Sequence, residues 1–591
     1  MIAKADEKLK KYPIAGIVFA LLTVILIIRG FYGFCQSDES FYVSTAGRFA
    51  AGDLIFVDEW HPTQLFSLIT MPFYKLYTVL TGGTAGIILY FRVLFVLLTA
   101  FEAFVSYRIV SGRAGGIAAE RGYADIPALA LGLFLMLYCH LNMPTLSYYT
   151  LSYNFFIFAF ILCYGGINRS GQGRGAYFTA GGAVFALSVL SLPSLAVAAV
   201  FLTAVLAVIC LKVPAIRRPL FLFVIGILIP LALFIIYLYA SGNSIAGLLA
   251  NLPYIISDEE HDREFVESFK VFFRAISDVF GRIYYLSIVM VILAILSYVD
   301  LKLQRWIRPC ILYTDLLLFI YFVVLASGHT GFINTAFALF VFPLFFLARR
   351  KDWYIFLALF MGGLVFSMTC TFSSYCDLYV LAVGHGIAAA GGLLLLWDMI
   401  LELLEGRRLA AFALAMAAVS FIMVTAVLRF INVYRDDRIS RLDTRITAGP
   451  AAGLYTSSEH KALYDSVLGS IMEYTDKCSE NGVQGKNGGR VLFSKLLPWG
   501  YTAVNMRVAA PDTWRNTIAS ERLAEYYKSH EMPDIVFVLN TEVGAYESSG
   551  DVEADALVNL NEFSGDFADI LRSEYNEYAD NNCTVYIRKA D

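Results

Sequence analysis

Charge is scarce in this sequence. Asp, Glu, Lys and Arg together make up 16% of its 591 residues, whereas hydrophobic residues make up 58%. A soluble domain has about 25% charged residues, so this scarcity argues against a soluble protein and predicts a membrane protein. The net charge of −4 at pH 7 also argues against nucleic acid as a partner, because proteins that bind nucleic acid usually carry a basic face.

Several sequence motifs are also missing. None of the nine cysteines falls in a C-x-x-C pattern, which argues against a zinc or redox motif. The polar C-terminal part of the chain contains no G-x-G-x-x-G pattern, no P-loop and no nucleophile elbow. Cys478 and Cys583 lie in this part. They could form a disulfide if it faces an oxidising compartment, and the sequence leaves this open.

Long apolar runs are abundant. A window of about 19 residues predicts thirteen transmembrane segments. The segments cover residues 13–34, 84–106, 125–141, 152–167, 176–190, 193–211, 219–240, 283–299, 310–326, 331–348, 353–370, 378–404 and 408–430. The first run is long enough to span a bilayer, and no small-residue cleavage site precedes the "CQSDES" that follows it. We therefore expect an uncleaved first helix rather than a signal peptide.

The basic residues predict the orientation of the chain. If the N-terminus is cytoplasmic, most of the Lys and Arg residues in the connections between spans lie in the inner connections, as the positive-inside rule requires. The rule predicts a multi-pass protein of the plasma membrane with a cytoplasmic N-terminus. The long loops 35–83 and 241–282 then lie outside. An odd number of spans places the two ends of the chain on opposite sides of the membrane. The region 431–591 therefore also lies outside.

The C-terminal region has the composition of a soluble domain. "RVLFS", "DIVFVL" and "CTVYIRK" read as strands, and "SSEHKALYDSVLGSIMEY" and "DTWRNTIASERLAEYYKSH" read as helices. Ser457 or Ser458 and Asp512 are the expected helix N-caps. Alternating strands and helices predict an extracytoplasmic α/β domain over residues 431–591.

The first outer loop concentrates acidic residues. Asp38 and Glu39 follow the first span directly, and Asp58, Glu59 and His61 come about twenty residues later. Carboxylates at a helix start are favoured by the helix dipole by about 0.3–1 kcal/mol, which is a purely structural explanation. The alternative is a general base, because desolvation near the bilayer surface raises the pKa of a carboxylate toward values useful for proton transfer.

The same loop contains helix signals. Ser37 or Asp38 can cap a helix that runs to about Ala51, and Gly52 is a natural stop. The stretch that begins "VDEWHPTQ" predicts a second helix with Pro62 near its first turn. We expect two helices on the membrane surface, joined by an acidic turn.

The stretch "FYVSTAGRFAAGDLIFVDEWHPTQLFSLITMPFYKLY", placed after a first span and an Asp-Glu pair, resembles the first extracytoplasmic loop of GT-C-type membrane glycosyltransferases. Protein O-mannosyltransferases and aminoarabinose transferases are the nearest examples. The resemblance covers roughly residues 13–280. It implies a GT-C-like membrane module over residues 1–280 and variable transmembrane helices over 281–430.

The resemblance also implies a chemistry. An acid just after the first helix is the usual catalytic base in this class, a role that falls to Asp38, with Glu39 as the neighbouring acid. Asp58 falls where the loop lines the site, and Glu59 and His61 would shape the same pocket. The donor would be a sugar linked to polyprenyl phosphate, and the anomeric carbon would be inverted.

The second outer loop departs from the family pattern. Many relatives carry an acid there, whereas "HLNMPTLSYYTLSYNFF" contains no Asp or Glu. Asn142, Ser147, Tyr148, Tyr149 and Asn154 could bind sugar hydroxyl groups. Without a carboxylate they form a poor site for a divalent metal. We therefore assign no metal ligand and identify no cofactor, and dependence on a divalent metal is left open.

The other long outer loop, 241–282, combines charges of both signs. In "SDEEHDRE", Asp258 and His261 either form a solvated turn or belong to a lid near the acceptor. Lys270, Arg274 and Arg282 follow at wide helical spacings. They either hold the phosphate of a lipid-linked donor or extend toward lipid headgroups.

Three further polar residues lie in or near spans. Arg92 lies inside the second span, where a charged residue normally faces protein, so it either binds a phosphate or pairs with Asp38 or Asp58. Arg29 is expected to extend its side chain toward the membrane surface. His329 lies in an outer loop and could reach the site, although a lone loop histidine usually has no functional role.

These observations favour an integral membrane hexosyl- or pentosyltransferase of the cell envelope. It would move a sugar from a polyprenyl-phosphate donor to an extracytoplasmic glycan, lipid or protein. The alternatives are a transporter or flippase of lipid-linked sugars and a non-catalytic membrane scaffold. A transporter should show internal repeats and ionisable groups at the midplane of its spans. The sequence has no clear repeat, and its acids collect at one surface.

Overall fold

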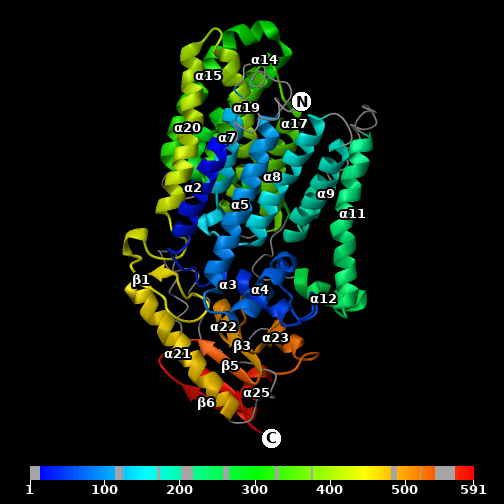
Figure 1. Ribbon diagram of the computed structural model, residues 1–591, viewed down its shortest axis with the longest axis vertical. Coiled ribbons are helices and arrows are strands. Elements are labelled where there is room, and N and C mark those ends of the chain that lie inside the picture. The colour runs from blue at the N-terminus through cyan, green and yellow to red at the C-terminus, as the bar shows by residue number, and fades with distance from the viewer. Residues whose placement is uncertain are drawn as a thin grey trace.

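The computed structural model describes most of the chain. The described residues are 13–112, 123, 125–169, 173–200, 217–256, 265–326, 332–373, 377–480, 489–494, 496–518, 521–539 and 566–590. They form a bundle of long helices and a smaller part that contains a β-sheet, stacked along the long axis of the molecule (Figure 1).

The bundle is built from apolar helices. They are α2 (Pro13–Arg29), α5 (Ile87–Ser111), α7 (Asp125–Leu137), α8 (Tyr148–Ile167), α9 (Gly173–Ser191), α11 (Arg217–Ala240), α14 (Tyr284–Val299), α15 (Leu301–Ala326), α16 (Ile333–Leu347), α18 (Gly362–Ser373, preceded by α17, Trp353–Ile355, and η6, Phe356–Met361), α19 (Asp377–Leu403) and α20 (Arg408–Ile431). Among the described residues, eight helices are long and apolar enough to cross a membrane. The chain is thus a polytopic α-helical membrane protein.

Helices lie at the predicted spans throughout the described residues. Only the beginning of the predicted span 193–211 is described, as far as residue 200, so the count of thirteen stays a prediction. The orientation of the termini relative to the cytoplasm also stays a prediction.

Burial separates central helices from peripheral ones. In α8 and α19, 83% of an apolar stretch of 18 residues is buried, whereas in α11 only 11% of such a stretch is buried. Helix α11 therefore lies at the edge of the bundle. Small residues allow the central helices to approach closely. A Cβ atom on Gly384 of α19 would lie 2.3 Å from the backbone nitrogen of Ser367 in α18. Close contact through small residues is the usual way in which membrane helices pack.

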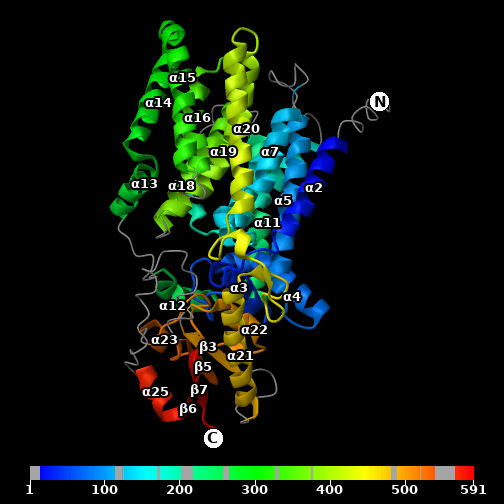
Figure 2. The same cartoon turned by 90° about the vertical axis from the view of Figure 1, so that its left-hand side faces the viewer.

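The first loop forms α3 (Asp38–Ala50), η1 (Gln64–Phe66) and α4 (Ser67–Thr81). These elements lie between the bundle and the C-terminal part (Figure 2). The predicted helix start and stop are confirmed, because α3 begins at Asp38 and Gly52 has a φ of +104°. α3 lies at the boundary between the bundle and the C-terminal part and is enclosed by protein. Most of its residues are buried, and Ser44 donates a hydrogen bond of 2.6 Å to the carbonyl of Pro498 in the C-terminal part.

The long loop 241–282 contains α12 (Ile245–Ile256), α13 (Phe265–Phe280) and η5 (Gly281–Ile283). In Figure 2, α13 lies at the left edge of the bundle beside α18, away from α3. Asp258 and His261 lie outside the described residues, and so does His329.

The C-terminal part contains a five-stranded sheet in the order β4-β3-β5-β7-β6. The strands are β3 (Arg490–Ser494), β4 (Arg507–Val508), β5 (Ile535–Leu539), β6 (Tyr575–Ala579) and β7 (Cys583–Arg588). β3 pairs in parallel with β4 and β5, and β7 pairs antiparallel with β5 and β6. The three predicted strands are confirmed as β3, β5 and β7. Every residue of β5 is buried, which places this strand at the centre of the domain.

The helices of this part are α21 (Ser458–Glu480), α22 (Pro498–Ala503), α23 (Glu521–Tyr526) and α25 (Asp566–Glu574). The helix predicted for "SSEHKALYDSVLGSIMEY" is confirmed as α21. The helix predicted for "DTWRNTIASERLAEYYKSH" is wrong in its first half. Asp512 accepts the backbone N–H of Trp514 at 2.7 Å, and the side chain of Asn516 donates to the Asp512 carbonyl. Such local bonds compete with helix formation.

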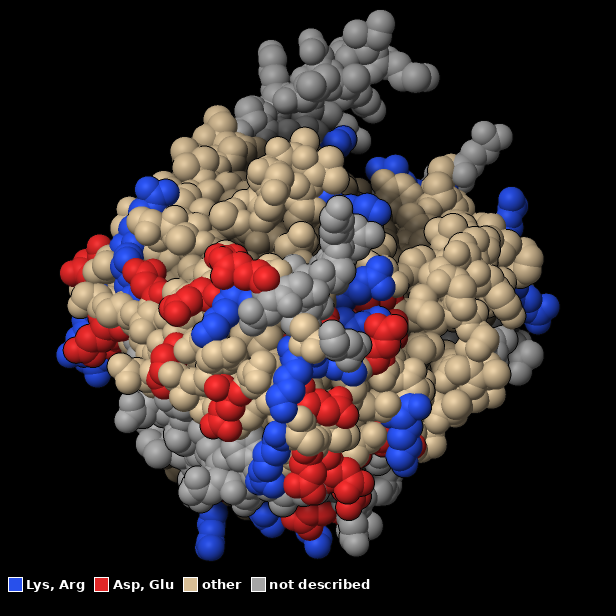
Figure 3. Space-filling model, turned by 90° about the horizontal axis from the view of Figure 1, so that it is seen from below, with Lys and Arg blue, Asp and Glu red and all other residues tan. Residues whose placement is uncertain are grey.

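The C-terminal part presents a mixed polar face to the outside. Lys and Arg alternate with Asp and Glu over the surface seen from below (Figure 3).

Cys478 and Cys583 are both buried free thiols, so the open question of their pairing is answered in favour of unpaired cysteines.

The two parts are joined by backbone hydrogen bonds at several places, two of which flank α3. Near the end of α2, the backbone N–H of Gly33 donates to the Tyr455 carbonyl at 2.8 Å, and the N–H of Tyr455 donates to the Phe31 carbonyl at 2.7 Å. In the first loop, the N–H of Trp60 donates to the Pro511 carbonyl at 2.7 Å. The C-terminal part therefore binds the chain both before α3, at Gly33, and after it, at Trp60.

Candidate functional site

Asp38 is the first residue of α3 and lies at the boundary between the two parts of the molecule. Its carboxylate Oδ2 accepts the hydroxyl of Tyr434 at 2.8 Å and lies 3.0 Å from Nη1 of Arg435. Within the described residues, Oδ1 has no hydrogen-bond partner, and 20% of the side chain is exposed. One oxygen is therefore fixed while the other stays available.

The partners of Asp38 come from the segment that follows α20. Arg435 has a φ of +49°, a left-handed conformation that costs energy for a residue with a side chain. This conformation accompanies an additional hydrogen bond of 2.5 Å from its Nη1 to Oγ of Ser37. Burial and the negative charge of Asp38 raise the pKa of Tyr434 well above its usual value. Tyr434 therefore remains a hydrogen-bond donor to Asp38 at physiological pH.

Glu39 faces in another direction and pairs with Arg92. Its Oε1 and Oε2 accept Nε and Nη2 of Arg92 at 2.6 and 2.5 Å, and both side chains are buried. Arg92 also donates to the Gly30 carbonyl at 2.7 Å. Of the two alternatives for Arg92, the ion pair is observed, although with Glu39 rather than with Asp38 or Asp58. This pair fastens α3 to α5 and the end of α2.

Glu59 is used in a similar way. It is fully buried, and its Oε2 lies 2.9 Å from Nη1 of Arg48 and also accepts the hydroxyl of Thr513. Its Oε1 accepts the backbone N–H of His61 at 3.1 Å. Arg48 pairs in addition with Asp53 at 2.8 Å. Glu59 thus joins the first loop to the C-terminal part.

Asp58 has both carboxylate oxygens engaged. Oδ1 lies 3.2 Å from Nε2 of His530, and Oδ2 accepts the backbone N–H of Leu54 at 2.5 Å. Partial burial opposes its charge, but the hydrogen bonds from His530 and Leu54 prevail and lower the pKa of Asp58. His61 lies in the following turn, where its Nδ1 accepts the backbone N–H of Thr63 at 3.2 Å.

The second outer loop supplies helix contacts. Ser147 caps α8 by accepting the backbone N–H of Thr150 at 3.0 Å. Asn154 is buried within α8 and donates to the Thr150 carbonyl at 2.8 Å. Tyr148 is half-buried, and its ring centroid lies 5.4 Å from that of Tyr42 in α3. Of these residues, Tyr148 therefore packs directly beside the helix that carries Asp38.

The cations of α13 are not gathered at Asp38. Lys270 and Arg274 are mostly exposed and lie 3.4 and 3.7 Å from Glu267 on the same helix. Arg282 is exposed in η5. Arg29 differs from its prediction. It is buried and donates to the carbonyls of Phe430 and Asn432, at 3.2 and 2.7 Å, rather than extending to lipid.

Sequence reasoning missed the segment "RFINVYRDD", which contains Arg429, Tyr434 and Arg435. A signal was present. Two arginines flank the end of the last span on the side that otherwise carries few basic residues, and such exceptions to the charge rule usually have a partner.

One cluster could present metal ligands. Asp436, Asp437 and His460 place ligand atoms within 4.8 Å of one another. However, Asp436 already accepts the backbone N–H of Phe34 at 2.7 Å, the hydroxyl of Thr456 at 2.9 Å and the ring of His460 at 2.5 Å. The cluster therefore fits a hydrogen-bonded joint rather than a metal site.

A comparison with solved structures gives seven matching chains, of which two are described here. The chain matches an oligosaccharyltransferase of Archaeoglobus fulgidus, in complex with Zn and sulfate, at 14% identity over 97% of this chain and 73% of that one, with a TM-score of 0.47. It matches ArnT of Cupriavidus metallidurans, bound to undecaprenyl phosphate, at 10% identity over 96% and 97% of the two chains, with a TM-score of 0.44.

At these TM-scores neither match assigns a role to any residue of this chain. No protein-family model matches the chain, and no curated protein matches it.

Proposed function

We propose that this protein is an integral membrane glycosyltransferase that moves a sugar from a polyprenyl-phosphate donor to an extracytoplasmic acceptor, with Asp38 as the general base. One observation carries the proposal. Among the four acids of the two Asp-Glu pairs, Asp38 alone keeps a carboxylate oxygen without a partner in the described residues.

The geometry suits proton transfer. A general base needs an accessible oxygen within hydrogen-bond reach of the proton that it removes. Among the described residues nothing binds Oδ1 of Asp38, so it can make this contact, while Tyr434 and Arg435 hold Oδ2 and fix the plane of the carboxylate. The start of α3 also favours the negative charge, because the backbone N–H groups of the first turn point toward it.

The proposed reaction is a single displacement. The acceptor hydroxyl gives its proton to Oδ1 of Asp38, and its oxygen forms a bond to the anomeric carbon of the sugar. The bond from that carbon to the phosphate oxygen breaks, and polyprenyl phosphate leaves with the electron pair. Asp38 then loses its proton to water. Attack opposite the leaving group inverts the anomeric carbon.

The test uses the full-length protein in membrane vesicles supplied with radiolabelled undecaprenyl-phosphate hexoses and pentoses. We expect the label to reach an acceptor with the wild-type protein, and we expect Asp38→Asn to lower the rate at least about 100-fold, as for loss of a general base. The control is Asp443→Asn, which removes an exposed carboxylate after α20 and should retain the rate.

Two results would contradict the proposal. Asp38→Asn could retain wild-type transfer while the protein is folded. Alternatively, the label could cross the vesicle membrane with the donor intact and no transfer to an acceptor, which is the outcome expected of a flippase.

A further inference from the structure

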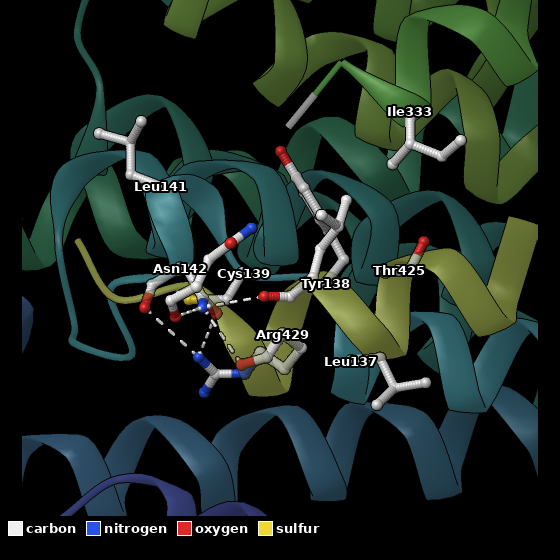
Figure 4. Close-up of a pocket in the computed structure, with 10 residues that line it drawn as sticks. Leu137, Tyr138, Cys139, Leu141, Asn142, Ile333, Thr425 and Arg429 are labelled. Carbon is white, nitrogen blue, oxygen red and sulfur yellow. Dashed lines mark hydrogen bonds between the residues drawn. The ribbon is translucent and has the colours of Figure 1, made fainter. Parts of the chain in front are cut away.

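A cavity of about 40 Å³ lies where the end of α20 meets the second outer loop. Its polar lining comes from Tyr138, Cys139, Asn142, Thr425, Arg429 and Asn432 (Figure 4). A water molecule needs about 10–15 Å³ of such space, so the cavity has room for about three waters.

Arg429 lines this cavity and has unused hydrogen-bonding capacity. Only 2% of the residue is exposed. Its Nη1 donates to Oδ1 of Asn142 at 2.7 Å, whereas Nε and Nη2 have no hydrogen-bond partner in the described residues. Buried polar groups are nearly always partnered, and an exception indicates an unseen water, ion or ligand.

The surroundings of Arg429 are positively charged. Arg29 lies close enough to interact with it electrostatically and donates only to neutral carbonyl groups. Neither arginine has a carboxylate partner among the described residues. The third nearby arginine, Arg92, is neutralised by Glu39. Two uncompensated positive charges in a buried region favour the binding of an anion.

The backbone beside the cavity is arranged to orient Arg429. Leu141 and Asn142 have φ values of +52° and +58°, a left-handed conformation that is costly for Leu141 and that asparagine adopts more readily. The side-chain amide of Asn142 donates to the carbonyls of Leu428 and Arg429 at 3.2 and 3.1 Å. These bonds turn its Oδ1 toward the guanidinium group.

We propose that this cavity binds a phosphate-type oxyanion, with Arg429 as the residue that contacts it. A guanidinium group with two unused N–H-bearing nitrogens matches the spacing of two phosphate oxygens. The proposal rests on the proposed function only for the source of the oxyanion, either the phosphate of a polyprenyl lipid or free phosphate. The same short segment carries Arg429 on one side and the partners of Asp38 on the other.

The test measures binding of two probes to the full-length protein in nanodiscs. The probes are undecaprenyl phosphate and inorganic phosphate. We expect at least one of them to bind, and we expect Arg429→Gln to weaken its binding at least about tenfold, as for loss of charge-assisted hydrogen bonds. Arg429→Lys, which keeps the charge but not the fork, should lie between the two. Arg408→Gln, at the exposed opposite end of α20, should bind as the wild type does.

Asn142→Ala is the second variant in case Arg429→Gln does not fold. It removes the acceptor that orients Arg429, and we expect a smaller loss of affinity, about threefold to tenfold. Binding of the lipid probe alone identifies a lipid headgroup as the source, and equal binding of both probes identifies a free anion. No binding of either probe, or unchanged affinity in Arg429→Gln and Asn142→Ala, overturns the proposal.

The two proposals fail separately. If Asp38→Asn retains transfer, the proposed function is wrong whatever the binding data show. If transfer depends on Asp38 but Arg429→Gln leaves affinity unchanged, the oxyanion site is wrong and the proposed function is unaffected.

Discussion

The first loop contains an Asp-Glu pair twice, as Asp38-Glu39 and as Asp58-Glu59, and the two pairs can be compared directly. In each pair the glutamate is fully buried against an arginine. In each pair the aspartate is partly exposed, with 20% of the side chain of Asp38 and 24% of that of Asp58 open to solvent. In each pair, therefore, the glutamate holds the loop in place through a buried ion pair, and the aspartate stays partly open to solvent.

The difference between the pairs lies in the aspartates. Both oxygens of Asp58 are occupied, by His530 and by the N–H of Leu54, whereas one oxygen of Asp38 is open in the described residues. The side-chain partner of Asp58 is His530, which follows α23 in the C-terminal part, whereas the partners of Asp38, Tyr434 and Arg435, lie in the segment that directly follows α20. The comparison teaches that an acid pair in a loop indicates where charge collects, and its hydrogen bonds decide which acid can react.

The largest expected effect is on Glu39. Glu39→Gln leaves Arg92 charged and buried without a counter-ion, which should lower the free energy of unfolding by about 3–5 kcal/mol. Unfolding of the purified protein in detergent measures it. The double variant Glu39→Gln/Arg92→Gln should recover part of the loss. A stability equal to that of the wild type in the single variant would show that the buried pair does not fasten α3.

Glu59→Gln should cost less, about 2–3 kcal/mol, because Arg48 keeps Asp53 as a counter-ion. The same unfolding experiment, run beside Glu39→Gln, checks the ranking. Proteolysis should also find the contact between the first loop and Thr513 loosened. A loss larger than that of Glu39→Gln would break the comparison between the two buried pairs.

Tyr434→Phe removes one of the two bonds that hold Oδ2 of Asp38 and leaves Asp58 untouched. A hydrogen bond to a charged group contributes about 1.5–3 kcal/mol, so we expect transfer to fall about tenfold while stability changes little. The rate of label transfer and the unfolding midpoint are measured on the same preparation. His530→Gln, which affects Asp58, is the matched variant and should leave the rate nearly unchanged. A fall in rate with His530→Gln alone would reverse the assignment of the two aspartates.

The smallest effect concerns pH. The folded protein lowers the pKa of Asp58, so this residue contributes stability above its unfolded pKa, and that contribution is lost as pH falls through the folded pKa. Asp58→Asn should therefore be less stable than the wild type by about 1 kcal/mol near pH 6, and the difference should shrink as the pH falls from about 4 to about 2. A difference that stays constant between these pH values would show that Asp58 acts through its shape rather than its charge.

Much of the fold follows from local sequence signals. The apolar runs predict the helices of the bundle, and the strands "RVLFS", "DIVFVL" and "CTVYIRK" are correct because alternating and buried apolar residues are a local property. The start of α3 at Asp38 and its end near Gly52 are equally local. The failed half-helix after Asp512 shows the limit, because side-chain bonds to the backbone there compete with helix formation.

The candidate site was predictable only in part. The sequence pointed to Asp38, but it placed Arg29 toward lipid and Ser147 toward a sugar. Arg29 instead binds the carbonyls at the end of α20, about 400 positions away in the chain, and Ser147 caps its own helix. Tyr434 and Arg435 were missed for the same reason, since their contact with Asp38 joins residues at opposite ends of the bundle's sequence.

The sequence by itself determined that this protein is a helical membrane protein with a small sheet domain, because hydrophobic length and periodicity are written along the chain. It also determined that acids collect at the exit of the first span. Only the tertiary structure decided that Glu39 and Glu59 form buried ion pairs and that both carboxylate oxygens of Asp58 have partners. It also decided that Asp38 and Arg429 keep polar atoms without a partner among the described residues. Hydrogen bonding and burial depend on groups brought together from distant parts of the chain, and no local pattern encodes which partner arrives.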